Sequence, residues 1–472
     1  MIHGIILNGY DKFKDTLFRP AGAYRIREAC RQAGYQVEVL EFFPFWEEEA
    51  LLTYLDRVVS RETLFIGIST TFIKFTEALG GFVDRLKLRY PDVKLILGGT
   101  KTDVAFVTQS LDYRLLGYAD AAIVALLDFL SGRSDQLITR DDGRGGLLLD
   151  SSNYPADMTN IPIRFLPEDH LTPLEVLPME ISRGCIFKCK FCSFPMTGKK
   201  KFDYIRDEVS IREEFIYNHD QFGITEYVFM DDTYNDSLHK LEMMHRAIMS
   251  LPFTIRYSTY LRIDLISRYP EMIPLLVETG LRTAAIGIES FHQPTRTIIG
   301  KGMVIEEILE TIRALKRANP QLVFHSGFIV GLPEESMESI TKTAEWLITE
   351  NNGLIDQWEF LPYGMETEAT VYRSPIDKNP ELFGYTVLGH RDWINQYMSY
   401  SEAKRMAKQL NKLSAPYQRV AGFPLPSVLA LGYSEDYLRE TPLGDIPWDA
   451  VKVRLTDRIR DYQNKKFANL MR

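Results

Sequence analysis

The chain has 472 residues, of which 45% are hydrophobic and 25% are charged, and its formal net charge is −9. This composition excludes a disordered chain and is typical of a globular protein with two or three domains. The acidic balance argues against a broad surface for duplex nucleic acid. The sequence has no apolar stretch long enough to span a membrane and no signal-peptide pattern at its start, so we expect a cytoplasmic protein.

The first 135 residues alternate short apolar runs with segments of helical spacing. The predicted strands are residues 3–7, 37–42, 64–69, 93–98 and 112–116. This alternation predicts a doubly wound parallel sheet, that is, a Rossmann-like α/β domain. Ligands of such sheets bind beyond the carboxyl ends of the strands, and glycine there lets the backbone approach a bulky ligand closely. Candidate binding residues therefore follow the third and fourth strands: Ser69, Thr70, Thr71, Gly98 and Gly99.

Three further regions follow along the chain. Residues 136–175 are rich in Asp, Gly, Ser, Asn and Pro, which predicts a linker. Residues 176–367 contain six strand–helix units, which predict a partial (β/α)6 barrel of the TIM type. Its predicted strands are residues 176–182, 225–231, 253–260, 283–289, 322–330 and 355–361. Residues 368–472 contain two helical stretches and predict a small, mainly helical C-terminal region.

Three of the four cysteines lie directly after the first predicted barrel strand, at Cys185, Cys189 and Cys192. A C-x3-C-x2-C loop can place its thiolates around one face of a [4Fe–4S] cluster, which normally takes four thiolates. Three ligands leave one iron open to a substrate or cofactor. The alternatives are a reduced structural loop and a zinc site. Zinc takes four ligands, usually as separated pairs, and no His follows this loop at the spacing of a zinc finger.

Polar residues also follow the second, third and fourth barrel strands, where barrels place their reactive groups. Asp231 and Asp232 can accept hydrogen bonds from an ammonium group, or they can cap a helix. Arg262 can bind a carboxylate as a planar fork. Glu289 and Ser290 can contact ribose hydroxyls or a carboxylate. The structural alternative for this set is a buried ion pair between Arg262 and Glu289.

The fifth barrel strand contains two glycines, one on either side of an isoleucine. Gly327 and Gly331 leave space, and Ile329 between them supplies an apolar contact. His325 on the same strand is a candidate proton acceptor in the barrel. A single histidine on a strand is more often a packed residue, so both interpretations stay open.

These motifs, in this order, resemble the radical SAM (S-adenosylmethionine) superfamily. The resemblance is carried by the cysteine loop, by Phe191 before its third cysteine, and by the runs Phe229–Asn235, Ile286–Ser290 and Gly327–Glu334. It implies a [4Fe–4S] cluster on the three cysteines and a reductant such as flavodoxin or ferredoxin. It also implies reductive cleavage of SAM to a 5′-deoxyadenosyl radical. The implied SAM contacts are Asp231, Asp232, Arg262, Glu289, Ser290, Gly327, Ile329 and Gly331.

The N-terminal domain resembles the cobalamin-binding domains found ahead of radical SAM domains, through residues 19–39, Ile66–Ser69 and Leu97–Gly99. Two departures stand out. The cobalt-ligating Asp-x-His-x-x-Gly is absent, and Gly117–Asp120 stands where Gly-Glu-Gly-Glu is common. If cobalamin binds, this domain supplies no histidine to the cobalt. An α/β domain without a cofactor is the alternative.

The combined resemblance implies a cobalamin-dependent radical SAM methyltransferase that acts on an unactivated carbon. Its substrate is a small molecule or a peptide that the sequence does not name. Two other functions stay open. One is radical rearrangement or cyclisation without methyl transfer, and the other is a non-catalytic iron–sulfur redox or sensing protein.

Overall fold

The computed structural model divides the chain into two compact units. Unit 1 consists of residues 1–173, 217–223 and 449–472, and unit 2 of residues 174–216 and 224–448. The described residues are 2–11, 17–73, 76–99, 108–141, 143, 145–154, 162–172, 175–194, 205–366, 373–389, 391–422 and 424–470. The two units are treated separately below.

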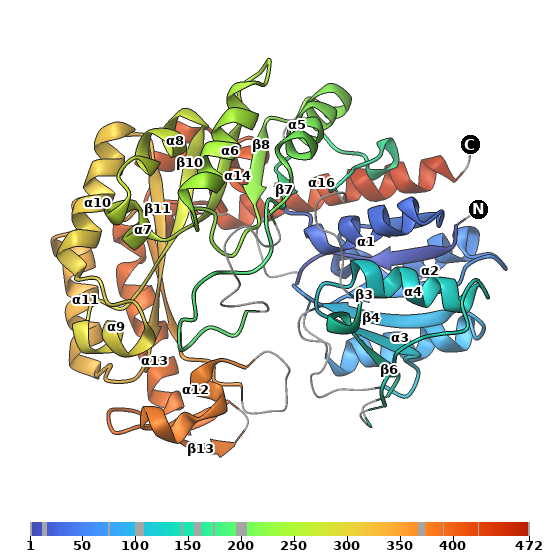
Figure 1. The fold of residues 1–472 in the computed structure, drawn as a ribbon, viewed down its shortest axis with the longest axis horizontal. Coiled ribbons are helices and arrows are strands. Elements are labelled where there is room, and N and C mark those ends of the chain that lie inside the picture. The colour runs from blue at the N-terminus through green and yellow to red at the C-terminus, as the bar shows by residue number, and fades with distance from the viewer. Residues whose placement is uncertain are drawn as a thin grey trace. The chain divides into compact units, whose positions relative to one another are not determined.

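Unit 1 contains a parallel six-stranded sheet in the order β2-β1-β3-β4-β5-β6 (Figure 1). Its strands are β1 (Gly4–Leu7), β2 (Val37–Leu40), β3 (Phe65–Ser69), β4 (Lys94–Gly99), β5 (Tyr113–Leu116) and β6 (Leu147–Asp150). The first five were predicted from their apolar runs. The strand order reverses direction between β1 and β3, and such a switch point opens a crevice beside the carboxyl ends of the two strands.

The sixth strand differs from the prediction, because β6 lies in the stretch predicted to be a linker. It continues the parallel sheet through pairs such as Leu115 with Leu149. Leu148 and Leu149 are buried, so this strand contributes to the core although polar and glycine-rich residues surround it.

Helices of unit 1 cover the sheet and include one from the far end of the chain. They are α1 (Ala21–Gln32), α2 (Glu48–Val58), α3 (Glu77–Arg89), α4 (Asp120–Leu130) and α16 (Trp448–Asn469). Helices α1 and α4 pack together and share a buried ion pair, Arg25 to Asp120 at 3.6 Å. The last 24 residues were predicted to belong to a separate C-terminal region, whereas the structure groups them with the N-terminal sheet.

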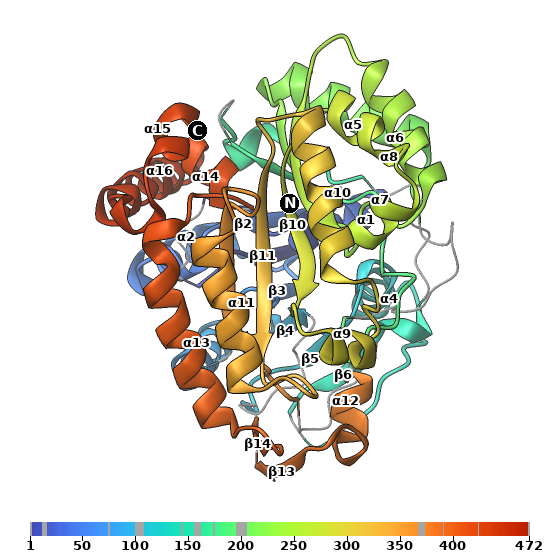
Figure 2. The same ribbon diagram turned by 90° about the vertical axis from the view of Figure 1, so that its left-hand side faces the viewer.

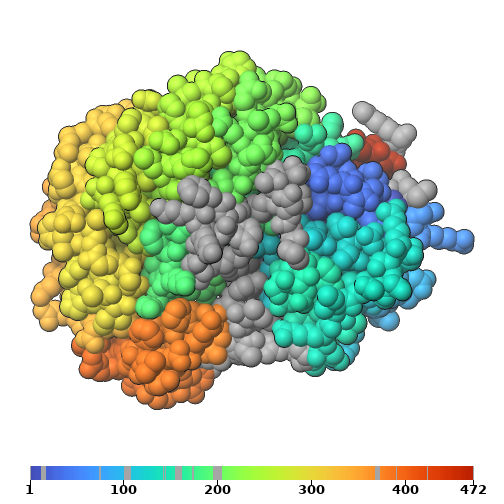
Figure 3. Space-filling view, in the orientation of Figure 1, coloured from blue at the N-terminus to red at the C-terminus, as the bar shows by residue number. Residues whose placement is uncertain are grey.

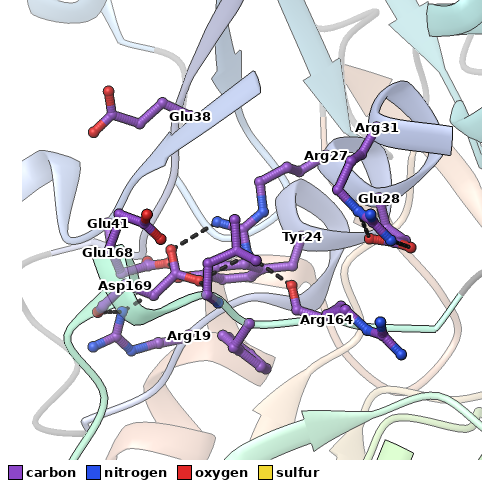
Figure 4. Close-up of polar contacts among 12 residues, drawn as sticks. Arg19, Tyr24, Arg27, Glu28, Arg31, Glu38, Glu41, Arg164, Glu168 and Asp169 are labelled. Atoms are coloured by element: carbon purple, nitrogen blue, oxygen red, sulfur yellow. Dashed lines mark hydrogen bonds and ion pairs between the residues drawn. The ribbon is translucent and has the colours of Figure 1, made fainter. Parts of the chain in front are cut away.

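A buried polar cluster joins α16 and the end of the 136–175 stretch to the sheet (Figure 4). The Glu41 carboxylate accepts hydrogen bonds from the Tyr24 hydroxyl at 2.8 Å and from the Asn8 amide at 2.9 Å. The Glu41 backbone N–H donates to the Tyr462 hydroxyl at 2.9 Å. The Asp169 carboxylate accepts hydrogen bonds from Nη1 and Nη2 of Arg27, both at 2.7 Å. The cluster fixes three distant chain segments at the carboxyl end of β2.

Unit 2 contains a second parallel six-stranded sheet, in the sequential order β12-β11-β10-β9-β8-β7. Its strands are β7 (Leu177–Met179), β8 (Glu226–Phe229), β9 (Arg256–Leu261), β10 (Leu281–Glu289), β11 (Val323–Val330) and β12 (Gln357–Pro362). All six lie where apolar runs predicted them. Sequential parallel order with a helix after each strand is the topology of a partial (β/α)6 barrel, so the predicted fold class is confirmed.

The helices of unit 2 lie on the outer face of this sheet. They are α5 (Glu208–Phe222), α6 (Leu238–Met249), α7 (Ile263–Arg268), α8 (Met272–Glu278), α9 (Gln293–Ile299), α10 (Ile305–Ala318) and α11 (Met337–Thr349). Figure 2 shows α10 and α11 in front of β10 and β11. In the space-filling view, yellow and green residues of these helices form the left and upper surface (Figure 3). Helices α7 and α8 are separated at Pro270, because proline cannot continue a helix.

The remainder of unit 2 packs beside the last strands. It comprises α12 (Pro375–Lys378), α13 (Tyr400–Ser414), α14 (Pro424–Ala430), α15 (Glu435–Glu440) and a hairpin of β13 (Thr386–Gly389) and β14 (Asp392–Ile394). Helix α13 contacts β12 and lies beside α11 (Figure 2). Among the described residues, no helix combines the length and apolar character needed to cross a membrane.

Candidate active site

The cysteine loop begins at the carboxyl end of β7 and is fixed at several points. Cys185, Cys189 and Cys192 are each half-buried. The Cys192 N–H donates to the Cys189 carbonyl at 3.1 Å, which closes a turn around the last two thiols. Lys190 donates its N–H to Ile299 at the end of α9 and accepts one from Ile376, both at 3.0 Å. The loop is thus held by elements that follow it in sequence by more than a hundred residues.

The three thiols have the chemistry of a cluster site. Burial raises the pKa of Cys185 above its usual value and that of Cys192 to about 12. Repulsion from the neighbouring thiolates of the loop contributes to both increases, which places the three sulfurs within electrostatic range of one another. Such thiols become thiolates only beside a strong positive charge, as iron supplies. Within the described part of the chain, no three His, Cys, Asp or Glu side chains group tightly enough to hold a single metal ion. A cubane fits better, because each thiolate would bind a different iron.

Asp231 and Asp232 both lie at the carboxyl end of β8, but their environments differ. The Asp231 carboxylate is fully buried and accepts hydrogen bonds from the Ile181 and Ser182 N–H groups at 2.9 and 3.1 Å. Lys240 Nζ lies 2.5 Å from it. Asp231 therefore fixes the start of the cysteine loop. Asp232 is only half-buried and is the more accessible carboxylate of the two.

Arg262 follows β9 and faces the cysteine loop. Its guanidinium forms a fork with Asp264, with Nε donating to Oδ1 at 2.9 Å. Its Nη1 donates to the Cys189 sulfur at 3.4 Å, and the guanidinium carbon lies 3.7 Å from the centre of the Phe187 ring. The alternative ion pair between Arg262 and Glu289 does not form. Glu289 instead lies 3.4 Å from Lys301 Nζ.

Two glutamates lie in the left-handed region of backbone space, Glu289 at the end of β10 with φ 67° and Glu334 in the turn after β11 with φ 63°. Strained residues of this kind concentrate at functional sites. Ser290, next to Glu289, is fully buried and donates to Glu335 Oε2 at 2.5 Å. Burial raises the pKa of Glu335 to about 7. The Ser290 hydroxyl is thus engaged in the protein, whereas the Glu289 side chain, which pairs with Lys301, remains 16% exposed at the carboxyl end of β10.

The glycine-rich strand β11 provides open space at one of its two predicted glycines. Among the described residues, a Cβ added to Gly327 would meet nothing within 4 Å, whereas one on Gly331 would lie 2.4 Å from the Trp393 ring. Gly331 therefore accommodates the tryptophan of the β13–β14 hairpin. Ile329, on the same face as Gly327, is half-buried.

His325 lies on the same face of β11, two residues before Gly327. Burial lowers its pKa to about 4, so its ring is neutral at pH 7. A Cβ on Gly422 would lie 2.9 Å from the His325 Cβ, so the histidine packs against this backbone segment. The geometry favours a packed residue.

The second predicted binding site lies in unit 1 at the carboxyl ends of β3 and β4. Thr70 is buried and its N–H and hydroxyl both contact the Gly98 carbonyl, at 2.7 and 3.1 Å. Among the described residues, a Cβ on Gly98 would meet nothing within 4 Å. Gly99 has φ 138° and a Cβ there would lie 2.8 Å from the Thr71 nitrogen. Ser69 and Thr71 lie at the same strand end, beside the switch point between β1 and β3.

Comparison with known proteins agrees with this arrangement. Residues 179–347 match the family model described as the Radical SAM superfamily. A protein described as an uncharacterized methyltransferase from Pyrococcus horikoshii is 27% identical over 165 residues, 35% of each chain. The anaerobic magnesium-protoporphyrin IX monomethyl ester cyclase of Cereibacter sphaeroides is 26% identical over 259 residues, 52% of this chain and 39% of its own. The matched parts thus span well under half of these relatives.

Solved structures match over a larger share of the chain. The radical SAM methyltransferase TsrM from Kitasatospora setae, with cobalamin and a [4Fe–4S] cluster bound, matches with a TM-score of 0.64 and 15% identity, covering 99% of this chain and 100% of that one. The cobalamin-dependent SAM radical enzyme OxsB, with aqua-cobalamin bound, matches with a TM-score of 0.58 and 13% identity, covering 87% of this chain and 62% of that one.

The cysteine loop and the matched barrel identify residues 179–347 as a radical SAM domain. Over nearly the whole length of the chain, the fold is similar to that of the radical SAM methyltransferase TsrM.

Several residues of the site were not predicted from the sequence. Lys301 and Glu335 pair with predicted residues, and Asp264 and Thr233 lie beside the cysteine loop. Thr233 stands within the quoted run Phe229–Asn235, and Asp264 is two residues beyond Arg262, so proximity in sequence was the available signal. Lys301 and Glu335 gave none, because their partners are set by tertiary packing.

Proposed function

We propose that this chain is a cobalamin-dependent radical SAM enzyme that transfers a methyl group to an unactivated carbon. The observation that carries the proposal is the loop with three thiols at the carboxyl edge of a six-stranded parallel barrel sheet. The nearly full-length likeness to TsrM, and the strand end at Gly98 in unit 1, support the cobalamin part.

The chain's own residues have distinct tasks in this proposal. Cys185, Cys189 and Cys192 would hold a [4Fe–4S] cluster, and Asp231 keeps their loop in place. When bound, the cluster supplies the electron that cleaves SAM to a 5′-deoxyadenosyl radical, and cobalamin supplies the methyl group. Both groups carry the difficult chemistry, and the protein positions them and excludes water.

The SAM site is assigned to the edge of the sheet beside the cysteine loop. Asp232 would accept hydrogen bonds from the methionine ammonium. Glu289 would contact the ribose, and the open face at Gly327 and Ile329 would pack the adenine. The other three predicted SAM contacts would support the site indirectly. Ser290 donates to Glu335, Gly331 leaves room for the Trp393 ring, and Arg262 donates to the Cys189 sulfur.

In unit 1, cobalamin would bind at the rim formed by Ser69, Thr70, Thr71, Gly98 and Gly99. The domain provides no histidine for the lower face of cobalt, since the chain has none between His3 and His170. We therefore expect the cobalt to be bound without a protein imidazole from this domain.

A second candidate function is radical ring formation or rearrangement without methyl transfer. The relative described as an anaerobic magnesium-protoporphyrin IX monomethyl ester cyclase favours keeping it. Isotope from the SAM methyl group in a product would support methyl transfer, and a rearranged product without it would support the second candidate.

The test is anaerobic reconstitution of the full chain with iron and sulfide, followed by SAM and reductant, with and without added cobalamin. We expect 5′-deoxyadenosine and about one corrin per chain. Cys185→Ala should abolish both the cluster absorbance and SAM cleavage. If 5′-deoxyadenosine forms and no corrin binds, the cobalamin part is wrong. If the Cys185→Ala variant still cleaves SAM, the central assignment is wrong.

A further inference from the structure

The thiols of Cys185 and Cys189 contact polar side chains from neighbouring strand ends. Thr233, after β8, places its hydroxyl 3.2 Å from the Cys185 sulfur. Arg262, after β9, places Nη1 3.4 Å from the Cys189 sulfur. For Cys192, the hydrogen bond to sulfur comes from the backbone of Phe194. The side-chain contacts are therefore concentrated on the part of the loop that faces β8 and β9.

The direction of the Thr233 hydrogen bond depends on the state of the sulfur. A thiol can donate to the hydroxyl or accept from it, and the Thr233 hydroxyl also lies 2.8 Å from the Asp232 carbonyl. A thiolate has no hydrogen, so only the hydroxyl can then donate. A charged acceptor binds a donor more strongly than a neutral carbonyl does. Metal ligation of Cys185 therefore turns Thr233 into a donor to sulfur.

Arg262 is fixed so that one nitrogen of its guanidinium remains for the sulfur. Asp264 engages Nε and Nη2, and the Phe187 ring stacks on the guanidinium plane. The Asn235 side chain binds both the N–H and the carbonyl of Arg262, each at 2.9 Å. With 7% of its surface exposed, Arg262 has little freedom to turn away from Cys189.

We propose that Thr233 and Arg262 are positioning residues that set the reduction potential of the cluster by hydrogen bonding to two of its ligand sulfurs. This inference rests on the proposed function, because it requires the cluster. Reduction adds one electron, taken from an external reductant such as dithionite, and increases the negative charge on cluster and thiolates. Donors and a positive charge at the sulfurs stabilise that extra charge and raise the potential.

The test is a reductive titration of the reconstituted full chain without SAM, followed by the electron paramagnetic resonance signal of the reduced cluster. Thr233→Val keeps the side-chain shape and removes the donor. We expect its reduction equilibrium to shift about tenfold toward the oxidised form, equal to a midpoint potential lower by about 59 mV for one electron. Thr233→Ser keeps the hydroxyl donor, so its midpoint potential should equal that of wild type. Arg262→Gln, at the second sulfur, should lower the potential as well.

Thr259→Val is the matched control. Thr259 is also fully buried, lies on β9, and its hydroxyl has no hydrogen-bond partner among the described residues. Its replacement should leave the potential unchanged. If wild type, Thr233→Val and Arg262→Gln all form the cluster and share one potential, the inference is overturned. If the wild-type chain forms no cluster at all, the proposed function itself fails.

Discussion

The two units each bury a polar cluster, but the clusters serve different parts of the molecule. In unit 1, Glu41, Tyr24 and Asp169 connect the sheet to segments that arrive from far along the chain (Figure 4). In unit 2, Asp231 and Lys240 connect strand β8 to the first residues of the cysteine loop. The first cluster completes a domain, whereas the second holds a loop whose thiols would carry the chemistry. Buried charged groups in this chain therefore occur both where a domain is assembled and where the candidate site is held. Their position relative to the strand ends distinguishes the two cases.

The largest expected effect concerns the helix that completes unit 1. Leu455 and Ile459 are each 2% exposed on α16, whereas Val453 on the same helix is 60% exposed. Replacing a buried Leu or Ile by Ala costs about 2–5 kcal/mol. We expect the double variant Leu455→Ala/Ile459→Ala to unfold unit 1 at much lower urea concentration, measured by limited proteolysis of its fragments. Val453→Ala should match wild type. Equal resistance of the double variant and wild type would show that α16 is not part of this unit.

The next effect concerns the charge that supports the cysteine loop. Lys240 is fully buried and its Nζ lies 2.5 Å from Asp231 and 2.8 Å from the Ser182 hydroxyl. Removing one member of a buried ion pair leaves the other charge unpaired and costs about 3–5 kcal/mol. Lys240→Met should therefore destabilise unit 2 by this amount in urea denaturation.

The control for Lys240 is an exposed ion pair in the same unit. Lys342 and Glu338 form such a pair on α11 with both side chains largely exposed. Lys342→Met should leave the free energy of unfolding close to that of wild type, because solvent screens an exposed pair. If Lys240→Met is as stable as Lys342→Met, the cluster in unit 2 does not support the fold.

A pH titration compares the two units through one buried carboxyl in each. Burial raises the pKa of Glu41 in unit 1 and of Glu335 in unit 2 from 4.5 to about 7. Between these values the unfolded chain has lost the proton and the folded chain keeps it. Each carboxyl should therefore contribute a fall in stability of roughly 3 kcal/mol as pH rises from about 4.5 to 7, and this contribution should then level off. His170 in unit 1 and His325 in unit 2 contribute in the opposite direction, because burial lowers their pKa values.

Glutamine variants assign this pH dependence to its source. Glu41→Gln should remove the falling contribution from the pH profile of the unit 1 transition, and Glu335→Gln from that of unit 2, measured by urea denaturation at several pH values. A variant whose pH slope over this window equals that of wild type would contradict the direction given for its carboxyl.

Strand positions and fold class were predicted well because buried parallel strands leave continuous apolar runs in the sequence. The six barrel strands and five of the six strands of unit 1 follow this rule. Strand β6 does not, since its Leu147–Asp150 run is short and lies among Gly, Asp and Ser. β6 is an edge strand with one neighbour, so a short apolar run is enough to hold it in the sheet.

The sequence predicted which strand ends form the candidate site. It did not predict which of their polar atoms are free to contact a ligand and which are bound within the protein. Asp231 and Asp232 are adjacent and chemically identical in the sequence, yet one binds the loop backbone and Lys240 while the other is half-exposed. Likewise, Gly327 and Gly331 follow one motif, but only Gly331 meets Trp393. These differences arise from contacts with residues distant in sequence, and a motif contains no information about them.

The smallest expected effect tests one hydrogen bond of the cluster in unit 1. The Tyr462 hydroxyl on α16 accepts the Glu41 N–H at 2.9 Å, and both residues are buried. Tyr462→Phe would leave that N–H without its partner, at a cost of about 1–3 kcal/mol. We expect a lower urea midpoint for unit 1 and an unchanged midpoint for unit 2. Tyr417→Phe is the control, because that side chain is 55% exposed and its change should stay within about 0.5 kcal/mol. Equal midpoints for the two variants would mean that α16 is held by its apolar face alone, and that the polar cluster of unit 1 adds specificity of docking without adding stability.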